Sequence, residues 1–139
     1  MFLEVYVFNS PTVTEAQVYE EETLPDFPPT DILKEKIEAL AANVKWLNEE
    51  TGEISTSDYK GQVIFGNDKK AIYFRIVGGS DPVKLVLNLC HTNGWTSYTP
   101  ENEYFLDASL DTVKYWQDYK SYRGMIDGIF YKGRGANIE

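Results

Sequence analysis

The sequence is poor in the residues that most often carry out chemistry. Its 139 residues include one cysteine, Cys90, and one histidine, His91. One cysteine cannot form an internal disulfide, and one histidine cannot form a multi-histidine metal centre. On a helix these two neighbours would point about 100° apart, so they could not work together as nucleophile and base. We therefore expect no metal, no cofactor and no catalytic residue.

Long apolar runs and excess positive charge are also missing. No apolar stretch approaches the roughly 20 residues that span a bilayer. The N-terminal MFLEVYVFNS lacks the basic region of a signal peptide. The net charge of -9 discourages binding to nucleic acid, because phosphate backbones are negative. Together with the single cysteine, these features predict a cytoplasmic protein with neither a membrane nor a nucleic-acid partner.

The chain does contain enough apolar side chains to fold. Hydrophobic residues make up 42% of it and aromatic residues 14%, which is more than disordered chains carry. Its length is typical of one domain, so residues 1–139 are expected to form a single unit. We expect an α+β core in residues 1–108 with an acidic insertion at 13–29. Residues 109–139 would add a C-terminal helix and tail.

Hydrophobic periodicity predicts the secondary structure. Strands are expected at Phe2–Phe8, Gln62–Phe65, Ala71–Val77, Trp95–Tyr98 and Tyr104–Asp107, with a further strand at Met125–Tyr131. Helices are expected at Thr12–Glu22, at Thr30–Leu47, between Ser80 and Gly94, and from Ser109 onward. Between the second helix and the second strand, residues 48–61 are polar and typical of turns.

The order of these elements predicts the fold. In residues 1–98 it reads β–α–β–β–α–β, the split βαβ or ferredoxin-like pattern. This pattern gives an antiparallel sheet with both helices on one face. The predicted class is therefore α+β, with a C-terminal helical extension.

Acidic residues are concentrated in the first part of the chain. Residues 1–107 hold 18 of the 22 acidic residues but only 8 of the 13 basic ones. Dense carboxylates speed association with basic proteins, and exposed aromatics anchor interfaces. The alternative is an ordinary solvated surface. The candidate partner-binding residues are Glu20, Glu21, Glu22, Asp26, Phe27, Glu49, Glu50, Glu53 and Tyr59.

One segment carries a family resemblance. Ser80–Asp107 (SDPVKLVLNLCHTNGWTSYTPENEYFLD) and the start VYVFNSPTVTEAQ resemble a group of small bacterial immunity-like proteins. In that group a helix is followed by a glycine, a hydrophobic residue, a short strand and a turn. Thr99 and Glu101 stand where that group usually has Asp and Gln. The resemblance implies an immunity or antitoxin-type inhibitor of a basic partner such as a toxin nuclease, and it brings no catalytic residues.

Two other functions fit the same residues. A small-molecule-binding or enzymatic domain would place an aromatic pocket near His91. Its candidate aromatic residues are Tyr98, Tyr104, Phe105, Tyr115, Trp116, Tyr119 and Tyr122. A structural or assembly subunit would instead pair edge strands such as Tyr104–Asp107 between copies. The oligomeric state stays open.

Overall fold

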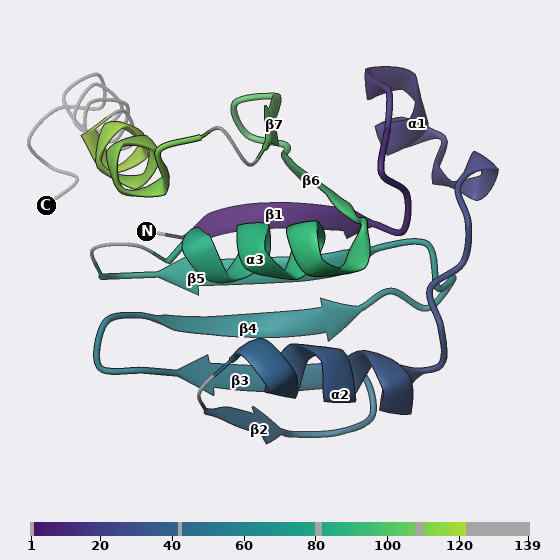
Figure 1. The fold of residues 1–139 in the computed structure, drawn as a ribbon, viewed down its shortest axis with the longest axis horizontal. Helices are drawn as coiled ribbons and strands as arrows, with labels where there is room; N and C mark the ends of the chain where they lie inside the picture. Colours follow the sequence, from purple (N-terminus) through teal and green to yellow (C-terminus); the bar gives the residue numbers. More distant parts are fainter. Residues whose placement is uncertain (1, 42, 80–81, 108–109, 122–139) are drawn as a thin grey trace, which may run out of the picture.

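One antiparallel sheet organises the molecule. The computed structural model describes residues 2–41, 43–79, 82–107 and 110–121. The seven strands lie in the order β2-β3-β4-β5-β1-β6-β7, and all neighbours are antiparallel (Figure 1). The strands are β1 Leu3–Phe8, β2 Val44–Trp46, β3 Thr51–Ser55, β4 Lys60–Phe65, β5 Ile72–Val77, β6 Thr96–Thr99 and β7 Tyr104–Leu106. The helices are α1 Glu15–Tyr19, the 3-10 turn η1 Glu21–Thr23, α2 Thr30–Leu40, α3 Lys84–Asn93 and a helical stretch at 112–121.

The two faces of the sheet differ because side chains alternate along a strand. In the neighbouring strands β1 and β5, every second residue is buried against the helices. These residues are Leu3, Val5, Val7, Ile72, Phe74 and Ile76. The residues between them, such as Tyr6 and Arg75, point to the opposite face. We call the first the helix face and the second the back face.

Helices α2 and α3 both cover the helix face (Figure 1). Leu33 and Ile37 of α2 and Leu89 of α3 join the strand residues in one core cluster. α3 ends at Gly94, whose φ of 69° is left-handed. That conformation favours glycine, as expected at a helix C-terminus.

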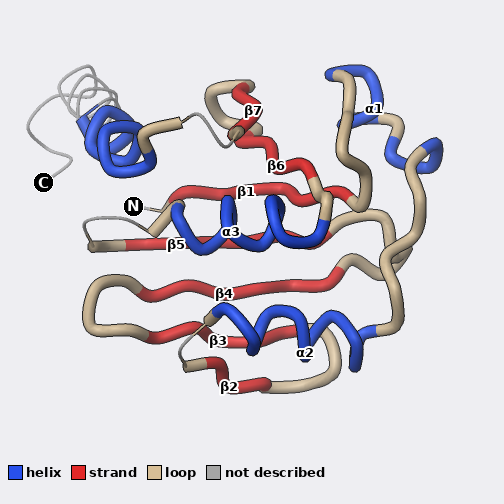
Figure 2. The backbone as a smooth tube through the Cα atoms, viewed as in Figure 1, coloured by secondary structure: helices blue, strands red, loops and turns tan. Residues whose placement is uncertain are grey.

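The insertion at 13–29 wraps around one end of the sheet (Figure 2). Its Val18 and Leu24 pack on the back face in a second cluster with Phe8, Ala71 and Tyr98. Further along, Phe27 packs on the helix face, where its ring meets Trp95 edge to face at 5.2 Å. The insertion therefore ties the two faces together.

The burial of Phe27 corrects one expectation. Phe27 was expected to be an exposed anchor, but it is 4% exposed. The acidic composition around it suggested a surface position. Its aromatic ring instead fills the core beside Trp95, which stabilises the fold through apolar burial.

A strand pair replaces part of a predicted helix. The helix expected at Thr30–Leu47 ends at Leu40, and β2 and β3 form a hairpin in a region expected to be helix end and loop. Asn48 makes the turn, since its side chain accepts hydrogen bonds from two following main-chain N–H groups. Gly52 of β3 lies opposite Trp46 of β2. This position requires glycine, because a Cβ there would lie 2.6 Å from the Trp46 ring.

The predicted class is confirmed in its coarse form. The protein is α+β with an antiparallel sheet. The ferredoxin-like pattern is not confirmed, because the sheet has seven strands. The expected C-terminal helix is present at 112–121. The strand predicted at Met125–Tyr131 lies outside the described residues.

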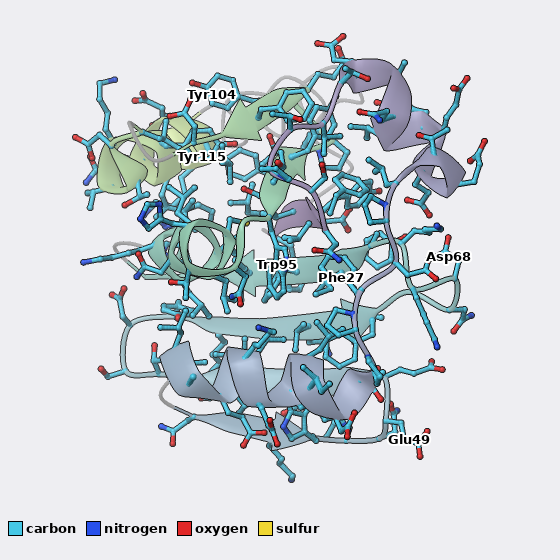
Figure 3. All side chains as sticks on the ribbon, turned by 45° about the vertical axis from the view of Figure 1, so that its right-hand side comes forward. Phe27, Glu49, Asp68, Trp95, Tyr104 and Tyr115 are labelled. Carbon is cyan, nitrogen blue, oxygen red and sulfur yellow. The ribbon has the colours of Figure 1, made fainter. Side chains whose placement is uncertain are left out.

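Aromatic residues attach the C-terminal helix to the rest of the fold. Trp116 is fully buried, and its Nε1 donates a hydrogen bond to the carbonyl oxygen of Gly79 at 2.8 Å. The Tyr119 hydroxyl lies within hydrogen-bond distance of the Phe2 carbonyl, at 2.9 Å, and of the Glu101 carboxylate. Tyr115 stacks on Tyr104 of β7 (Figure 3). These contacts pack 112–121 against the rest of the described fold.

We predict that Trp116→Ala will lower the free energy of unfolding by about 3–5 kcal/mol, because it leaves a large cavity and removes the indole hydrogen bond to the Gly79 carbonyl oxygen. Val113→Ala on the same helix is the control, since Val113 is 39% exposed and should change stability by less than about 0.5 kcal/mol. Urea unfolding measures both variants. An equal decrease in the free energy of unfolding of the two variants would contradict the docking of this helix through Trp116.

Candidate partner-binding surface

Carboxylates from three elements lie at one end of the sheet. Glu20, Glu21 and Glu22 lie in and beside η1, Glu49 and Glu50 in the β2–β3 turn, and Asp68 in the β4–β5 turn. Figure 3 shows Glu49 and Asp68 at the same end of the molecule. We call these six residues the acidic end.

The insertion is fixed to this end by a lysine. Lys70 Nζ lies 2.7 Å from the Asp26 carboxylate and donates to the Leu24 carbonyl oxygen at 2.7 Å. The Phe27 N–H donates to the Lys69 carbonyl oxygen at 2.7 Å. The charge of Asp26 is therefore compensated within the protein. Its role here is to hold the insertion against the β4–β5 turn.

Glu21 and Asp68 form a carboxyl pair across that contact. Partial burial, a hydrogen bond to Asp68 and the negative charges of Asp68 and Glu22 raise the pKa of Glu21 to about 7. A hydrogen bond from the Lys70 main-chain N–H, with a donor–acceptor distance of 3.0 Å, lowers the pKa of Asp68. The pair therefore shares a proton below neutrality and carries two negative charges above it.

Most carboxylates of the acidic end are not neutralised by a neighbouring cation. Glu20, Glu22, Glu49 and Glu50 form no ion pair within the described residues. Glu50 and Asp68 line a shallow hollow of about 400 Å³ together with Ile64 and Tyr73. This hollow offers two carboxylates and an apolar wall to an incoming cationic side chain.

Two more of the predicted residues lie elsewhere. Glu53 lies within β3 and is exposed, in register with Lys45 and Gln62. Tyr59 lies at the opposite end of the sheet, just before β4, and packs partly buried against the core. Neither residue belongs to the acidic end.

Asp68 is the residue that sequence reasoning missed. It lies in the turn Gly66-Asn67-Asp68, between the strands expected at Gln62–Phe65 and Ala71–Val77. A hairpin turn lies at the end of a sheet, so the turn was a usable signal for the location of Asp68. No sequence signal could have paired it with Glu21, because that contact depends on how the insertion folds back.

Cys90 and His91 line a different hollow, of about 470 Å³, beside the end of α3. Burial raises the pKa of the Cys90 thiol to about 12, although the neighbouring Ser97 side chain opposes this effect. A thiol this hard to ionise is a poor nucleophile.

Within the described ranges, no three His, Cys, Asp or Glu side chains are arranged to hold a metal ion. No described helix is both long enough and apolar enough to cross a membrane.

We predict that Cys90 will be unreactive in the folded protein. With a pKa near 12, on the order of 10⁻⁴ of the thiol is ionised at about pH 8, and the sulfur is buried. An aromatic disulfide reagent should therefore label it only on unfolding, whereas the urea-unfolded chain should react at the rate of a free thiol. Rapid labelling of the folded protein would contradict this.

We also predict that Glu21 makes stability depend on pH. Its folded pKa of about 7 exceeds the ordinary value of 4.5, so the folded protein keeps a proton that the unfolded chain loses between these values. The contribution of Glu21 to the free energy of unfolding therefore falls as pH rises from 4.5 to 7, by at most about 1 kcal/mol because the group is largely solvated. Asp68 acts in the opposite sense, because its pKa is lowered in the folded protein. Its contribution to the free energy of unfolding is lost as pH falls below 3.8.

Urea unfolding between about pH 4.5 and pH 8 tests the assignment to Glu21. Glu21→Gln should reduce the decline in stability and should be more stable than the parent protein at the upper end of that range. Glu35→Gln, on the exposed side of α2, is the control and should follow the parent curve. Parallel curves for the parent protein and Glu21→Gln would disprove the assignment.

Comparison with known proteins gives no family model that matches this chain and no curated protein that matches it.

Proposed function

We propose that this protein is a non-catalytic binding protein that recognises a basic partner protein through its acidic end. The observation that carries the proposal is the presence of six carboxylates from three separate elements at one end of the sheet, four of which form no ion pair among the described residues. Such a surface attracts a positively charged protein and speeds its association.

The surface is held in place before any partner arrives. The β2–β3 turn is closed by the Asn48 side chain, and Lys70 fixes the insertion that carries η1. Carboxylates on fixed turns lose little conformational entropy on binding. This organisation supports recognition of a partner with cations in matching positions.

An exposed aromatic residue lies beside the carboxylates. Tyr19, at the end of α1, is 67% exposed and directly precedes Glu20. Aromatic side chains are enriched among the residues that contribute most to protein interfaces. Tyr19 can therefore anchor a partner, whereas the buried Phe27 cannot.

The carboxyl pair gives the interaction a defined pH dependence. A partner cation near Glu21 and Asp68 favours loss of the shared proton, because it stabilises the doubly charged form. Affinity should therefore rise with pH up to about 7. A surface of fully ionised carboxylates would show little change over the same range.

The partner class that fits best is a toxin with a basic active site, such as a nuclease. Nucleases bind phosphate backbones through positive charge, and a dense carboxylate surface can compete for the same cations. The resemblance of residues 80–107 to immunity-like proteins supports this choice. The protein would then act as an immunity or antitoxin-type inhibitor that covers the active site of its partner.

Affinity capture tests the proposal with two variants of equal charge. Glu22→Lys/Glu50→Lys changes the acidic end, and Glu35→Lys/Glu103→Lys makes the same charge change at exposed positions elsewhere. The producing cells are lysed at about 50 mM salt, and bound proteins are identified by mass spectrometry. We expect one basic protein to bind the parent and the control variant and to be lost from the acidic-end variant.

The purified partner is then titrated by calorimetry and assayed for nuclease activity. Reversal of two charges should weaken binding on the order of 100-fold. Inhibition by the parent protein would support the antitoxin role, and binding without inhibition would leave only the binding role. Recovery of no basic protein, or equal binding by the two variants, would refute the proposal.

A further inference from the structure

A second polar site lies on the back face, away from the acidic end. The strand register places Gln62 opposite Arg75 and Lys60 opposite Val77, so these four side chains are neighbours on one face. Together with Phe2 they line a hollow of about 380 Å³. We call this the donor hollow. It lies where β4 begins, whereas the acidic end lies where β4 ends.

The side-chain donors of this hollow form no hydrogen bond within the described residues. Arg75 Nε is buried without a hydrogen bond, although it forms an ion pair with the Glu4 carboxylate at 3.5 Å. The side-chain N–H groups of Lys60 and Gln62 donate to no acceptor in the part of the chain that the structure describes. The exposed part of the Arg75 side chain and the Lys60 ammonium group are therefore open to an acceptor from outside the chain.

A phenyl ring holds the guanidinium group in place. The Phe2 ring lies 4.6 Å from Arg75 Cζ, a cation–π contact, and Phe2 is 49% exposed. Glu4 approaches from a neighbouring strand. The guanidinium is therefore oriented on the sheet while 42% of the Arg75 side chain stays exposed.

We infer that the donor hollow binds a small monocarboxylate with an apolar body. The planar fork of Arg75 matches the two oxygens of a carboxylate, and Lys60 adds a second positive charge. Phe2 and Val77 supply apolar contact for the rest of the ligand. This site is separate from the acidic end and is independent of the proposed partner.

Charge favours a monoanion over a dianion. The protein carries a net charge of -9, and Glu53 lines the same hollow. A second hollow on the other side of Phe2 and Arg75 is lined by Glu4 and Glu101, which would repel an anion. The carboxylate of the ligand therefore lies on the Lys60 side of Arg75. Each further negative charge on the ligand weakens binding.

Benzoate is the probe, titrated into the ¹⁵N-labelled protein and followed by NMR. We expect saturable shifts at the main-chain amides of β4 and β5 near Lys60 and Arg75, with a Kd on the order of 1 mM. Benzamide is the neutral control and phenyl phosphate the dianion. Benzamide should not bind, and phenyl phosphate should bind more weakly than benzoate. Stronger binding of phenyl phosphate would overturn the monocarboxylate assignment.

Variants locate the site. Arg75→Gln should weaken benzoate binding at least about 10-fold, and Arg75→Lys should weaken it by less. Lys84→Gln, on the exposed side of α3, removes the same charge elsewhere and should leave the Kd unchanged. If Arg75→Gln does not fold, Lys60→Gln with Gln62→Ala provides the same test. No saturation by benzoate, or equal weakening in Lys84→Gln, would overturn the inference.

Discussion

The alternation of side chains along β1 and β5 determines the rest of the structure. Their apolar residues, led by Val5 and Phe74, bind α2 and α3 to the helix face. The same alternation forces Tyr6 and Arg75 onto the back face, where the insertion covers only part of the sheet. Both proposed sites follow from this constraint. The acidic end lies where the insertion turns around the sheet, and the donor hollow lies on the part of the back face left open.

Parts of the fold could be predicted because their signals are local. β5 has apolar residues at every second position, and α3 has a helical apolar pattern ended by Gly94. The β2–β3 hairpin could not be predicted as easily. Val44 and Leu47 continue the helical spacing of α2, and only pairing with β3 overrides it. The unpredicted strands β2 and β3 therefore make the sheet larger than the periodicity of the sequence indicates.

The candidate site was predictable in composition but not in arrangement. Clustered glutamates in residues 20–22 and 49–50 indicated where negative charge would gather. The chain order says nothing about the approach of η1 to the β4–β5 turn, which brings Glu21 to Asp68 and gives Lys70 its two partners. Phe27 illustrates the same limit, since an aromatic residue between acidic and proline residues can be surface or core. Tertiary contact with Trp95 decides its position.

The central position of β1 also bears on how the chain acquires its structure during synthesis. β1 is made first, yet it pairs with β5 and β6, and the hydrogen bond from Thr96 to Ser10 spans 86 residues. Until β6 leaves the ribosome, one edge of β1 has no neighbour, and its valines lack a complete core. Complete pairing of β1 must therefore wait until β6 has been made, and contacts this distant in sequence slow folding.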